Sequence, residues 1–332
     1  MRIKSAIVLG ACVVTVVAAE SAAQPVKLAR MYQGRNRGPE QSDTFSRKIR
    51  IARDGRLSVS NVSGDITVSV APGDEVSIDA IKRWRGGRDL RDRVNIIVDE
   101  RPARIEIRTE YPEPWARGNG VDVDYTIAVP AGVALDVHSV SGRVRVAGVR
   151  GAVRLGSVSG SITATDTPGV EYARTVSGEI EIGGISHENA VSLSSVSGAI
   201  RVNGVKAREV ELSTVSGEAV LRDASCGRVT SKSVSGGFEY VGVLTRNGRY
   251  EVNSLSGSIR FALADNTGFE LNANSSSGSI RSDFQMTVGG QQNPEIRRGR
   301  RGPGDTLQAT FGDGTASLNL RTFSGSIVIT KK

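Results

Sequence analysis

The chain has 332 residues, a formal net charge of +8, 39 glycines and only 5% aromatic residues. The charge is spread along the sequence and aromatic rings are scarce. Both features argue against nucleic-acid binding, which needs a concentrated basic surface or rings on which bases stack. Glycine at this abundance without a collagen period indicates a chain with many turns.

The first 23 residues have the three regions of a secretory signal peptide. Arg2 and Lys4 precede the apolar run AIVLGACVVTVVAA, and Ser21 and Ala23 occupy the small-residue positions of a cleavage site. We therefore expect an exported protein of the bacterial periplasm or cell surface, cleaved after Ala23 rather than lipidated at Cys12. No later segment is apolar over the roughly 20 residues that a membrane helix needs, so we expect no transmembrane segment in the mature chain.

A short motif with the pattern Ser/Thr-Val-Ser-Gly recurs through most of the chain. From Gly142 to Gly278, successive motif glycines are separated by 18 to 21 residues. Apolar residues fill the second and fourth positions after nearly every glycine, and the fifth and seventh positions before it. Each copy therefore contains two short runs of period-two alternation, which predict two strands with one buried face each. The ten glycines are Gly64, Gly142, Gly160, Gly178, Gly198, Gly217, Gly236, Gly257, Gly278 and Gly325.

The register of these copies predicts how the strands pair. The same residue type recurs at the same place in every copy, so a parallel stack would set glycine on glycine and isoleucine on isoleucine. We predict an all-β fold, a β-solenoid that forms a single parallel β-helix-like rod with about 19 residues per coil and about 4.8 Å between coils. At the corner we expect the Ser/Thr and the following Val both to turn inward, and the glycine to adopt a positive φ.

A structural role for the repeated hydroxyls is favoured over a nucleophilic one. Hydroxyls at a corner can bond to the backbone or to neighbouring coils. A catalytic serine needs a base within reach, and the chain has only two histidines, His138 and His187, neither of them in a plausible triad. We expect His138 to be exposed and His187 to lie in a loop without a metal.

Two interruptions separate the regular copies. After the first copy, LSVSNVSGDITV, come four strand-like segments, EVSIDAI, VNIIVDE, RIEIRTE and VDYTIAVP. We predict that they form an antiparallel β elaboration near the N-terminal end, which covers the open edge of the stack. Near the other end, QQNPEIRRGRRGPGDT is rich in Arg, Gly and Pro and predicts a loop. The predicted divisions are a signal peptide at 1–23, a flexible N-terminal segment at 24–44, the first coil plus a β-strand cap at 45–132, regular coils at 133–284, a basic Gly/Pro-rich loop at 285–306 and a C-terminal coil at 307–332.

These motifs, in this order, resemble a bacterial β-strand-repeat family of unknown function whose members bear the name "putative adhesin". The resemblance rests on GRLSVSNVSGDITV, VDYTIAVPAGVALDVHSVSGRVRV, the serial VSG coils and LNLRTFSGSIVI, and it covers about residues 45 to 330. It implies a cell-envelope or surface protein and no established reaction. The long basic loop near Arg297–Arg301 departs from the family pattern.

In each copy of the motif, a second strand follows the glycine. The outward positions of these second strands argue for binding rather than catalysis. β-Helix enzymes that act on carbohydrate, lyases or hydrolases, need acids, bases or calcium on one face. Here Glu181 would lie beside Arg201 and Glu239 beside Arg260, which is a ladder of opposite charges rather than a carboxylate cluster. Val220, in the same column, is expected to be exposed and to tolerate substitution. We predict no catalytic residue, cofactor or metal site. We predict a non-enzymatic, adhesin-like scaffold or binding module. The alternatives are a β-helix enzyme that acts on carbohydrate and an envelope-stress signalling component.

Two basic segments and two tryptophans are the candidate contact residues. An anionic partner suits the arginines, whether lipopolysaccharide, an acidic envelope glycan or a surface protein, because arginine binds phosphate and carboxylate with paired hydrogen bonds. Trp beside Arg suits sugar or protein contact, and burial in the cap is the alternative for these rings. The candidate anionic-ligand contacts are Arg83, Arg85, Arg88, Arg297, Arg298, Arg300 and Arg301, and the candidate sugar or protein contacts are Trp84 and Trp115.

Overall fold

The computed structural model describes residues 39–85, 92, 94–111, 120–264, 267–288, 291–292 and 304–332. The expected signal peptide and Cys12 lie outside these residues. The described residues form strands and turns and contain no α-helix, which confirms the all-β class. Within those ranges, no helix is long and apolar enough to cross a membrane.

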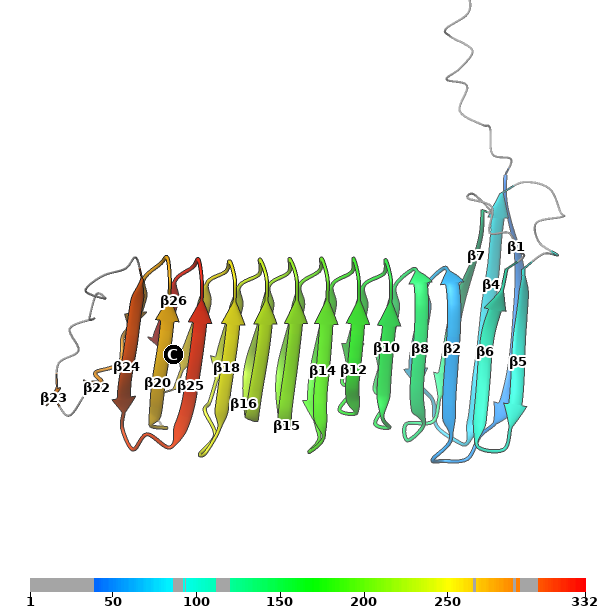
Figure 1. Ribbon diagram of the computed structural model, residues 1–332. Helices are drawn as coiled ribbons and strands as arrows, with labels where there is room; N and C mark the ends of the chain where they lie inside the picture. Colours follow the sequence, from blue (N-terminus) through cyan, green and yellow to red (C-terminus); the bar gives the residue numbers. More distant parts are fainter. Residues whose placement is uncertain are drawn as a thin grey trace, which may run out of the picture. The chain divides into compact units, whose positions relative to one another are not determined.

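The coils of the stack are built from strands numbered in chain order, and Figure 1 labels those for which there is room. The strands of the described residues are β1 (Glu40–Arg50), β2 (Arg56–Ser63), β3 (Ile66–Val70), β4 (Glu75–Arg85), β5 (Asn95–Arg101), β6 (Arg104–Glu110), β7 (Val121–Val129), β8 (Ala134–Ser141), β9 (Val144–Ala147), β10 (Val153–Ser157), β11 (Ile162–Thr165), β12 (Val170–Thr175), β13 (Ile180–Ser186), β14 (Ala190–Ser195), β15 (Ile200–Thr214), β16 (Ala219–Ser233), β17 (Phe238–Gly242), β18 (Arg249–Ser254), β19 (Ile259–Leu263), β20 (Phe269–Ser275), β21 (Ile280–Ser282), β22 (Thr287–Val288), β23 (Gln291–Gln292), β24 (Asp305–Phe311), β25 (Ala316–Thr322) and β26 (Ile327–Lys331).

Successive coils pair in parallel with like residues in register, as the repeated motif predicts. Ile162, Ile180 and Ile200 are Cα partners in β11, β13 and β15. The strands that precede the motif stack in the same way, with Leu155 of β10 opposite Val137 of β8. β15 and β16 are long because each pairs, along its length, with two shorter strands of a neighbouring coil. The first half of β15 pairs with β13 and its second half with β14, and β16 pairs likewise with β17 and β18.

The alternation buries one face of every regular strand. Ile162, Ile180 and Ile200 are all 0% exposed and belong to one continuous apolar core. Burial of each such side chain stabilises the fold by about 1.5–3 kcal/mol. Cys226 is the free cysteine of the described residues, so the described coils are held together by packed columns and backbone hydrogen bonds.

Ile180→Asp is expected to unfold the central coils, because a carboxylate without a partner in an apolar column loses its hydration. We expect the free energy of unfolding to fall by about 3 kcal/mol or more, measured by thermal denaturation followed by circular dichroism. Asn203→Asp is the matched control, because Asn203 is exposed on the outer face and in register with Arg222. Equal losses in the two variants would remove the assignment of inner and outer faces.

Val220 departs from the expectation for an outward position. Only 4% of this residue is exposed, although it lies on the outer face. It stands in register between Arg201 and Glu239, and Glu239 pairs with Arg222 at 3.4 Å. The stems of these long side chains cover the valine. The expected exposure of this position is therefore wrong, and we now expect Val220→Lys to disturb packing.

The N-terminal elaboration is only partly antiparallel. β4 pairs antiparallel with β7, β1 with β4, and β5 with β6, as predicted. However, β6 and β7 run parallel to β2 and β3, so they add one more coil beyond the first copy of the motif. That coil has no Val-Ser-Gly corner by which the sequence could reveal it. Residues 40–44, which the sequence placed in a flexible segment, belong instead to β1 and pair with residues 81–85.

The C-terminal coil lies inside the stack rather than at its end. β25 pairs in parallel with β18 on one side and with β20 on the other, and β26 lies likewise between β19 and β21. β24 covers β20 in the antiparallel direction, and Figure 1 shows the order β24, β20, β25, β18. β24 is thus a cap strand, although the sequence placed residues from 307 onward in the C-terminal coil. The order of the motifs along the chain therefore does not fix their order in space.

Candidate binding surface at the solenoid corner

The Ser or Thr of the motif forms a ladder of hydrogen bonds at the corner. The Thr175 hydroxyl accepts a hydrogen bond from the N–H of Gly178 (3.1 Å) and donates one to the carbonyl oxygen of Gly160 in the neighbouring coil (3.2 Å). Ser195 repeats this pattern with the N–H of Gly198 (2.8 Å) and the carbonyl oxygen of Gly178 (3.4 Å). Both hydroxyls are buried. They link one coil to the next, which agrees with the structural role predicted for them.

The motif glycine is needed for space more often than for backbone conformation. Among the ten, φ is positive at Gly64 (110°) and Gly142 (129°), and the expectation of a positive φ is wrong for the others. A Cβ on Gly198 would lie against the carbonyl oxygen of Gly178, far closer than van der Waals contact allows, and a Cβ on Gly178 would meet Gly160 in the same way. Adjacent coils approach so closely at this corner that no side chain fits between them.

The valine of the motif points out of the corner, not into it as expected. Val140 is 45% exposed, Val158 is 44% exposed and Phe323, which replaces valine in the last copy, is 59% exposed. The strand alternation continues one residue beyond the buried Ser or Thr, so the valine faces outward before the chain turns at Ser-Gly. Because the coils are in register, these residues form one line across the stack. We call this line the apolar ridge; it comprises Val62, Val140, Val158, Val176, Val196, Val215, Val234, Leu255 and Phe323.

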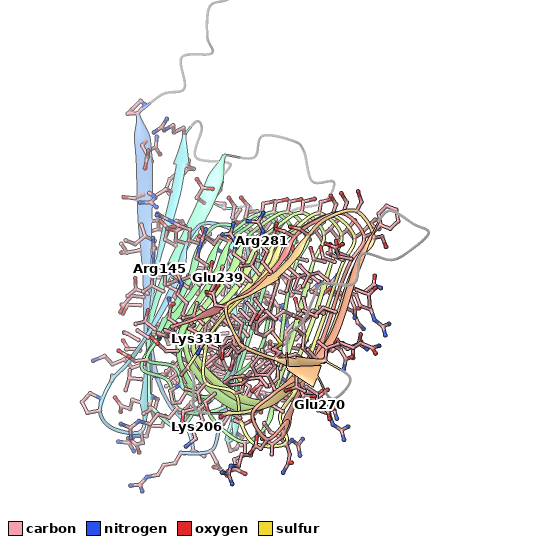
Figure 2. The ribbon with its side chains drawn as sticks, turned by 90° about the vertical axis from the view of Figure 1, so that its left-hand side faces the viewer. Arg145, Lys206, Glu239, Glu270, Arg281 and Lys331 are labelled. Carbon is pink, nitrogen blue, oxygen red and sulfur yellow. The ribbon has the colours of Figure 1, made fainter. Side chains whose placement is uncertain are left out.

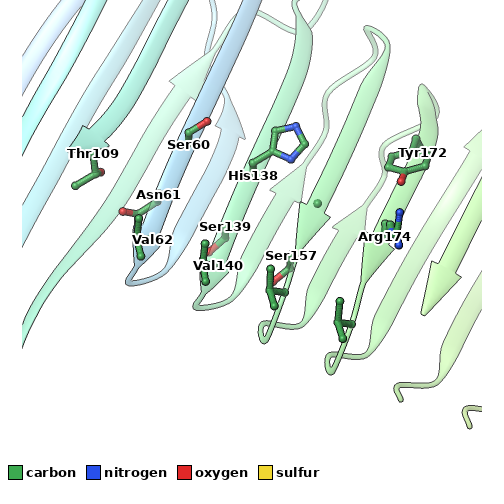
Figure 3. Close-up of a pocket in the computed structure, with 13 residues that line it drawn as sticks. Ser60, Asn61, Val62, Thr109, His138, Ser139, Val140, Ser157, Tyr172 and Arg174 are labelled. Carbon is green, nitrogen blue, oxygen red and sulfur yellow. The ribbon is translucent and has the colours of Figure 1, made fainter. Parts of the chain in front are cut away.

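A hollow of about 530 Å³ lies beside the apolar ridge, over the early coils (Figure 3). His138 of β8, Gly156 of β10 and Arg174 of β12 follow one another in register along it. Gly156 leaves this space open because it has no side chain, whereas its partners on both sides carry large ones. Figure 3 shows Tyr172 and Arg174 together on one side of the hollow and His138 on the other, and Gly156 lies in register between Arg174 and His138. The lining residues are Ser60, Asn61, Val62, Thr109, His138, Ser139, Val140, Gly156, Ser157, Val158, Tyr172, Arg174 and Val176.

Two lining residues carry polar atoms that the fold leaves unsatisfied. Within the described part of the chain, Asn61 Oδ1 and Ser139 Oγ are buried and have no hydrogen-bond partner. The amide nitrogen of Asn61, in contrast, donates to the carbonyl oxygen of Val123 at 2.8 Å. The hydroxyl ladder is therefore incomplete at this end of the ridge, where the hollow lies.

The outward face of the second strands carries the charged column that the sequence predicts. Glu181 is in register with Arg201, although the ion pair that Arg201 forms is with Glu179. Exposed pairs of this kind contribute about 0.2–1 kcal/mol each, so the column is a solvated face with modest stabilising effect. Arg145, Glu239 and Arg281 of this column are labelled in Figure 2.

Asp65 ties the first copy of the motif to the second. Its Oδ1 accepts a hydrogen bond from the backbone N–H of Arg143 (2.9 Å), and its Oδ2 accepts one from Arg143 Nε (3.0 Å). Arg145 Nη1 lies 3.5 Å from the same carboxylate. Partial burial alone would raise the pKa of Asp65, but the two hydrogen bonds and the two guanidinium charges outweigh it and hold that pKa below its usual range.

Asp65→Asn is expected to change how stability depends on pH. A folded-state pKa below the unfolded one contributes stability above about pH 4, and this contribution is lost as the pH falls through that region. The natural protein should therefore melt at a higher temperature than the variant at pH 7, and the difference should shrink at pH 3. Thermal melts at the two pH values provide the measurement. A gap of the same size at both would contradict a role for the Asp65 charge.

In the described part of the first basic segment, the arginines have acidic partners. Arg83 pairs with Asp124 and lies 3.9 Å from Glu40, and Arg85 Nη2 lies 2.6 Å from Glu40. The hydrogen bond and charge of Arg85 lower the pKa of Glu40. These two arginines are thus neutralised within the cap. The candidates Arg88, Arg297, Arg298, Arg300 and Arg301 lie outside the described residues.

Trp84 is buried in the cap and does not present its ring to a ligand. It is 4% exposed and belongs to the apolar core, because alternation along β4 places it on the same inward face as the buried Ile78 and Ala80. Burial, the alternative considered for this ring, is what the structure has. The other candidate, Trp115, lies outside the described residues.

His187 and Cys226 have local roles, and no cluster of metal ligands occurs in the described ranges. His187 lies between β13 and β14, with its Nε2 2.8 Å from the carbonyl oxygen of Val170 and its Nδ1 3.1 Å from the N–H of Asn189. Cys226 is buried within β16. Its burial raises the pKa of the thiol to about 11, so the reactive thiolate is scarce at neutral pH.

Sequence reasoning missed both the apolar ridge and the hollow. The signal for the ridge was the unbroken alternation through the motif, which places its valine outward. The signal for the hollow was Gly156, a glycine at an outward position where its neighbours in register are His138 and Arg174. Neither signal involves a residue type associated with chemistry, so a search for catalytic or metal-binding patterns does not find them.

Comparison with known proteins gives a family and a set of distant structural relatives. A family profile described as "Toastrack DUF4097" matches residues 56–319. No curated protein matches the sequence. A "putative adhesin" from Bacteroides fragilis is 10% identical, with a TM-score of 0.39 over 87% of this chain and 97% of that one. A "putative lipid binding protein" from Parabacteroides distasonis is 12% identical, with a TM-score of 0.34 over 87% and 97%. A "putative cell adhesion protein" from Clostridium sporogenes is 10% identical, with a TM-score of 0.26 over 88% and 100%.

Proposed function

The chain belongs to the Toastrack DUF4097 family, and on that premise we propose that it is an exported, non-enzymatic binding module of the bacterial cell envelope, of adhesin-like type. Its partner is an envelope glycan, lipopolysaccharide or another surface protein, contacted through the apolar ridge and the basic segment at 297–301. Export is supported by the charged, apolar and small residues that follow one another at positions 1–23.

The observation that carries this proposal is the apolar ridge. Single exposed apolar side chains are ordinary, but a contiguous line of them marks an interaction surface. Seven of its members are more than a third exposed: Val140, Val158, Val196, Val215, Val234, Leu255 and Phe323. The same contact recurs about every 4.8 Å, so an extended partner can make many equivalent contacts at once. Repeated weak contacts of this kind produce binding without a single strong site.

The hydroxyl ladder supports a binding role over a catalytic one. Thr175 and Ser195 both accept and donate a hydrogen bond within the fold, so their oxygens are occupied in linking coils. A nucleophilic hydroxyl needs a general base to take its proton, and these hydroxyls donate to backbone carbonyl oxygens instead.

The test is binding of the purified protein to purified envelope glycans at low and moderate salt. Contact through the basic segment at 297–301 should weaken strongly as salt rises, because exposed charges are screened over about 10 Å at 0.1 M. Replacement of Arg297, Arg298, Arg300 and Arg301 by glutamine should then reduce binding about tenfold at low salt. The matched control replaces four arginines of the coils by glutamine, Arg228, Arg249, Arg260 and Arg281, which are exposed. Unchanged binding after the first replacement, or equal losses in both, would exclude the 297–301 segment as the contact.

A further inference from the structure

We propose that the hollow beside Gly156 binds an anionic amphiphile, with the aliphatic chain against the apolar ridge and the phosphate or carboxylate at Arg174. The hollow measures about 530 Å³, which is within the usual range for small-molecule sites. None of the residues that line it belongs to the basic segments, so this proposal and the glycan contact tested above can fail independently of each other.

The wall on the side of the turn is aliphatic. Val62, Val140, Val158 and Val176 are successive members of the apolar ridge and line the hollow together. A chain laid along them crosses four coils, a span of about 14 Å at the spacing of paired strands. Removal of methylene groups from water against these methyl groups supplies the affinity.

Gly156 gives the hollow its depth. A Cβ at this position would come within 2.6 Å of His138 Nδ1, so even a methyl group would displace the histidine that forms one wall. His138 is itself held by Asp136, whose Oδ1 lies 2.9 Å from His138 Nε2. The wall on this side is therefore fixed by an ion pair or hydrogen bond that does not involve the hollow.

The polar end of the hollow is cationic. Arg174 is exposed and forms no ion pair with a carboxylate of the described residues, whereas Arg154 of β10 pairs with Glu171 at 3.5 Å. None of the described residues that line the hollow is an aspartate or a glutamate. A guanidinium without a partner can bind a phosphate or carboxylate through two parallel hydrogen bonds. A hollow with an aliphatic wall and one guanidinium at its edge fits a ligand with a long chain and an anionic head.

The test measures binding of dodecyl phosphate to the purified protein by isothermal titration calorimetry, below the concentration at which micelles form. Dodecyl maltoside has the same chain with a neutral head, and inorganic phosphate has the head without the chain. We expect dodecyl phosphate to bind at least tenfold more tightly than either. Shortening the chain should weaken binding by up to about fourfold for each methylene removed.

Two pairs of variants locate the site. Gly156→Leu fills the hollow and should weaken dodecyl phosphate binding at least tenfold, whereas Ser213→Leu, at the same outward position three coils further along, should change it less than twofold. Arg174→Gln should weaken dodecyl phosphate about tenfold and leave dodecyl maltoside unchanged. Lys232→Gln, in the same column as Arg174, is the control for loss of one positive charge.

The remaining outcomes decide the proposal. Where Gly156→Leu fails to fold, Val158→Ser replaces it, since Val158 is 44% exposed and contributes methyl groups to the hollow rather than to the core. Vesicles of phosphatidylglycerol distinguish a single bound chain from a membrane surface. Binding to vesicles without binding to dodecyl phosphate would overturn the hollow as the site. Unchanged affinity in Gly156→Leu or Val158→Ser, or equal affinity for inorganic phosphate, would overturn it as well.

Discussion

Gly198→Ala is expected to destabilise the stack by about 3 kcal/mol or more, although it adds only one methyl group. The new Cβ would meet the carbonyl oxygen of Gly178 in the adjacent coil. That oxygen also accepts the hydrogen bond of Ser195, so relief of the clash would break the ladder and separate two coils. Urea denaturation gives the free energy of unfolding, and hydrogen exchange around Ser195 and Thr214 shows whether the damage is centred on this corner.

Gly183→Ala tests whether the effect belongs to the corner. Gly183 lies within β13, and a Cβ there would have its nearest neighbours, the carbonyl oxygens of Ala164 and Asn203, at 4.0 Å. We expect a change within about 0.5 kcal/mol or a slight stabilisation, because alanine restricts the unfolded chain more than glycine does. A similar loss in both variants would mean that the strands tolerate no added side chain, and close approach at the corner would not be the cause.

Deletion of residues 316–332 is expected to lower the melting temperature by about 10 °C or more, since it opens a gap within the stack. β25 and β26 pair with a strand on each side, so their loss exposes four strand edges and the apolar columns behind them. Unpaired edges of this kind promote association between molecules. Thermal melts and sedimentation velocity measure the two effects.

A synthetic peptide of residues 316–332, added to the truncated protein, provides the control for this deletion. The gap presents hydrogen-bonding edges on both sides, and strands add readily to such edges. We expect the peptide to restore most of the lost stability, and a peptide of the same composition in scrambled order to restore none. A truncated protein that melts at the natural temperature, or that responds equally to both peptides, would contradict the position of this coil.

The alternation of residue types predicted the buried columns and the parallel register correctly. The buried columns and the register both follow from the period of two along a strand. The motif recurs often enough that this period identifies the strands without ambiguity between strand and helix. The same period also predicts that Val140 faces outward. The error there came from an added assumption, that the chain bends between the buried Ser139 and the valine, whereas the turn comes at the following Ser-Gly.

The order of the coils in space was not predictable in the same way. Every copy of the motif offers nearly the same edge to its neighbours, so the residues of β25 fit beside β18, β20 or another coil about equally well. The choice depends on the lengths of the connections and on the cap strand β24, which no local pattern encodes. The coil of β6 and β7 was missed for a related reason, since it shares the stacking but not the corner.

The hollow depends on one residue, Gly156, which has no side chain. Gly156 is unremarkable in a sequence with 39 glycines, and its meaning appears only when its register partners His138 and Arg174 are known. The buried Trp84 shows the opposite situation. An aromatic residue next to arginines suggests a contact, but alternation along β4 turns Trp84 to the buried face and the arginines on either side of it to the exposed face.

The enclosed position of the C-terminal coil also determines how the protein bears mechanical load. A pull on Lys332 acts on β26, which is bonded to β19 on one side and to β21 on the other, while the Lys332 N–H holds the carbonyl oxygen of Leu263 at 2.9 Å. The hydrogen bonds of a parallel pair are evenly spaced along the strand, and tension along β26 is shared by the bonds to β19 and those to β21. A coil at the outer edge would peel away from one neighbour only. Pulled from this end, the chain is held at Thr330 and Lys331 by β19 alone and at residues 327–329 by a strand on each side, so it should resist forces that would strip an edge strand from the same stack.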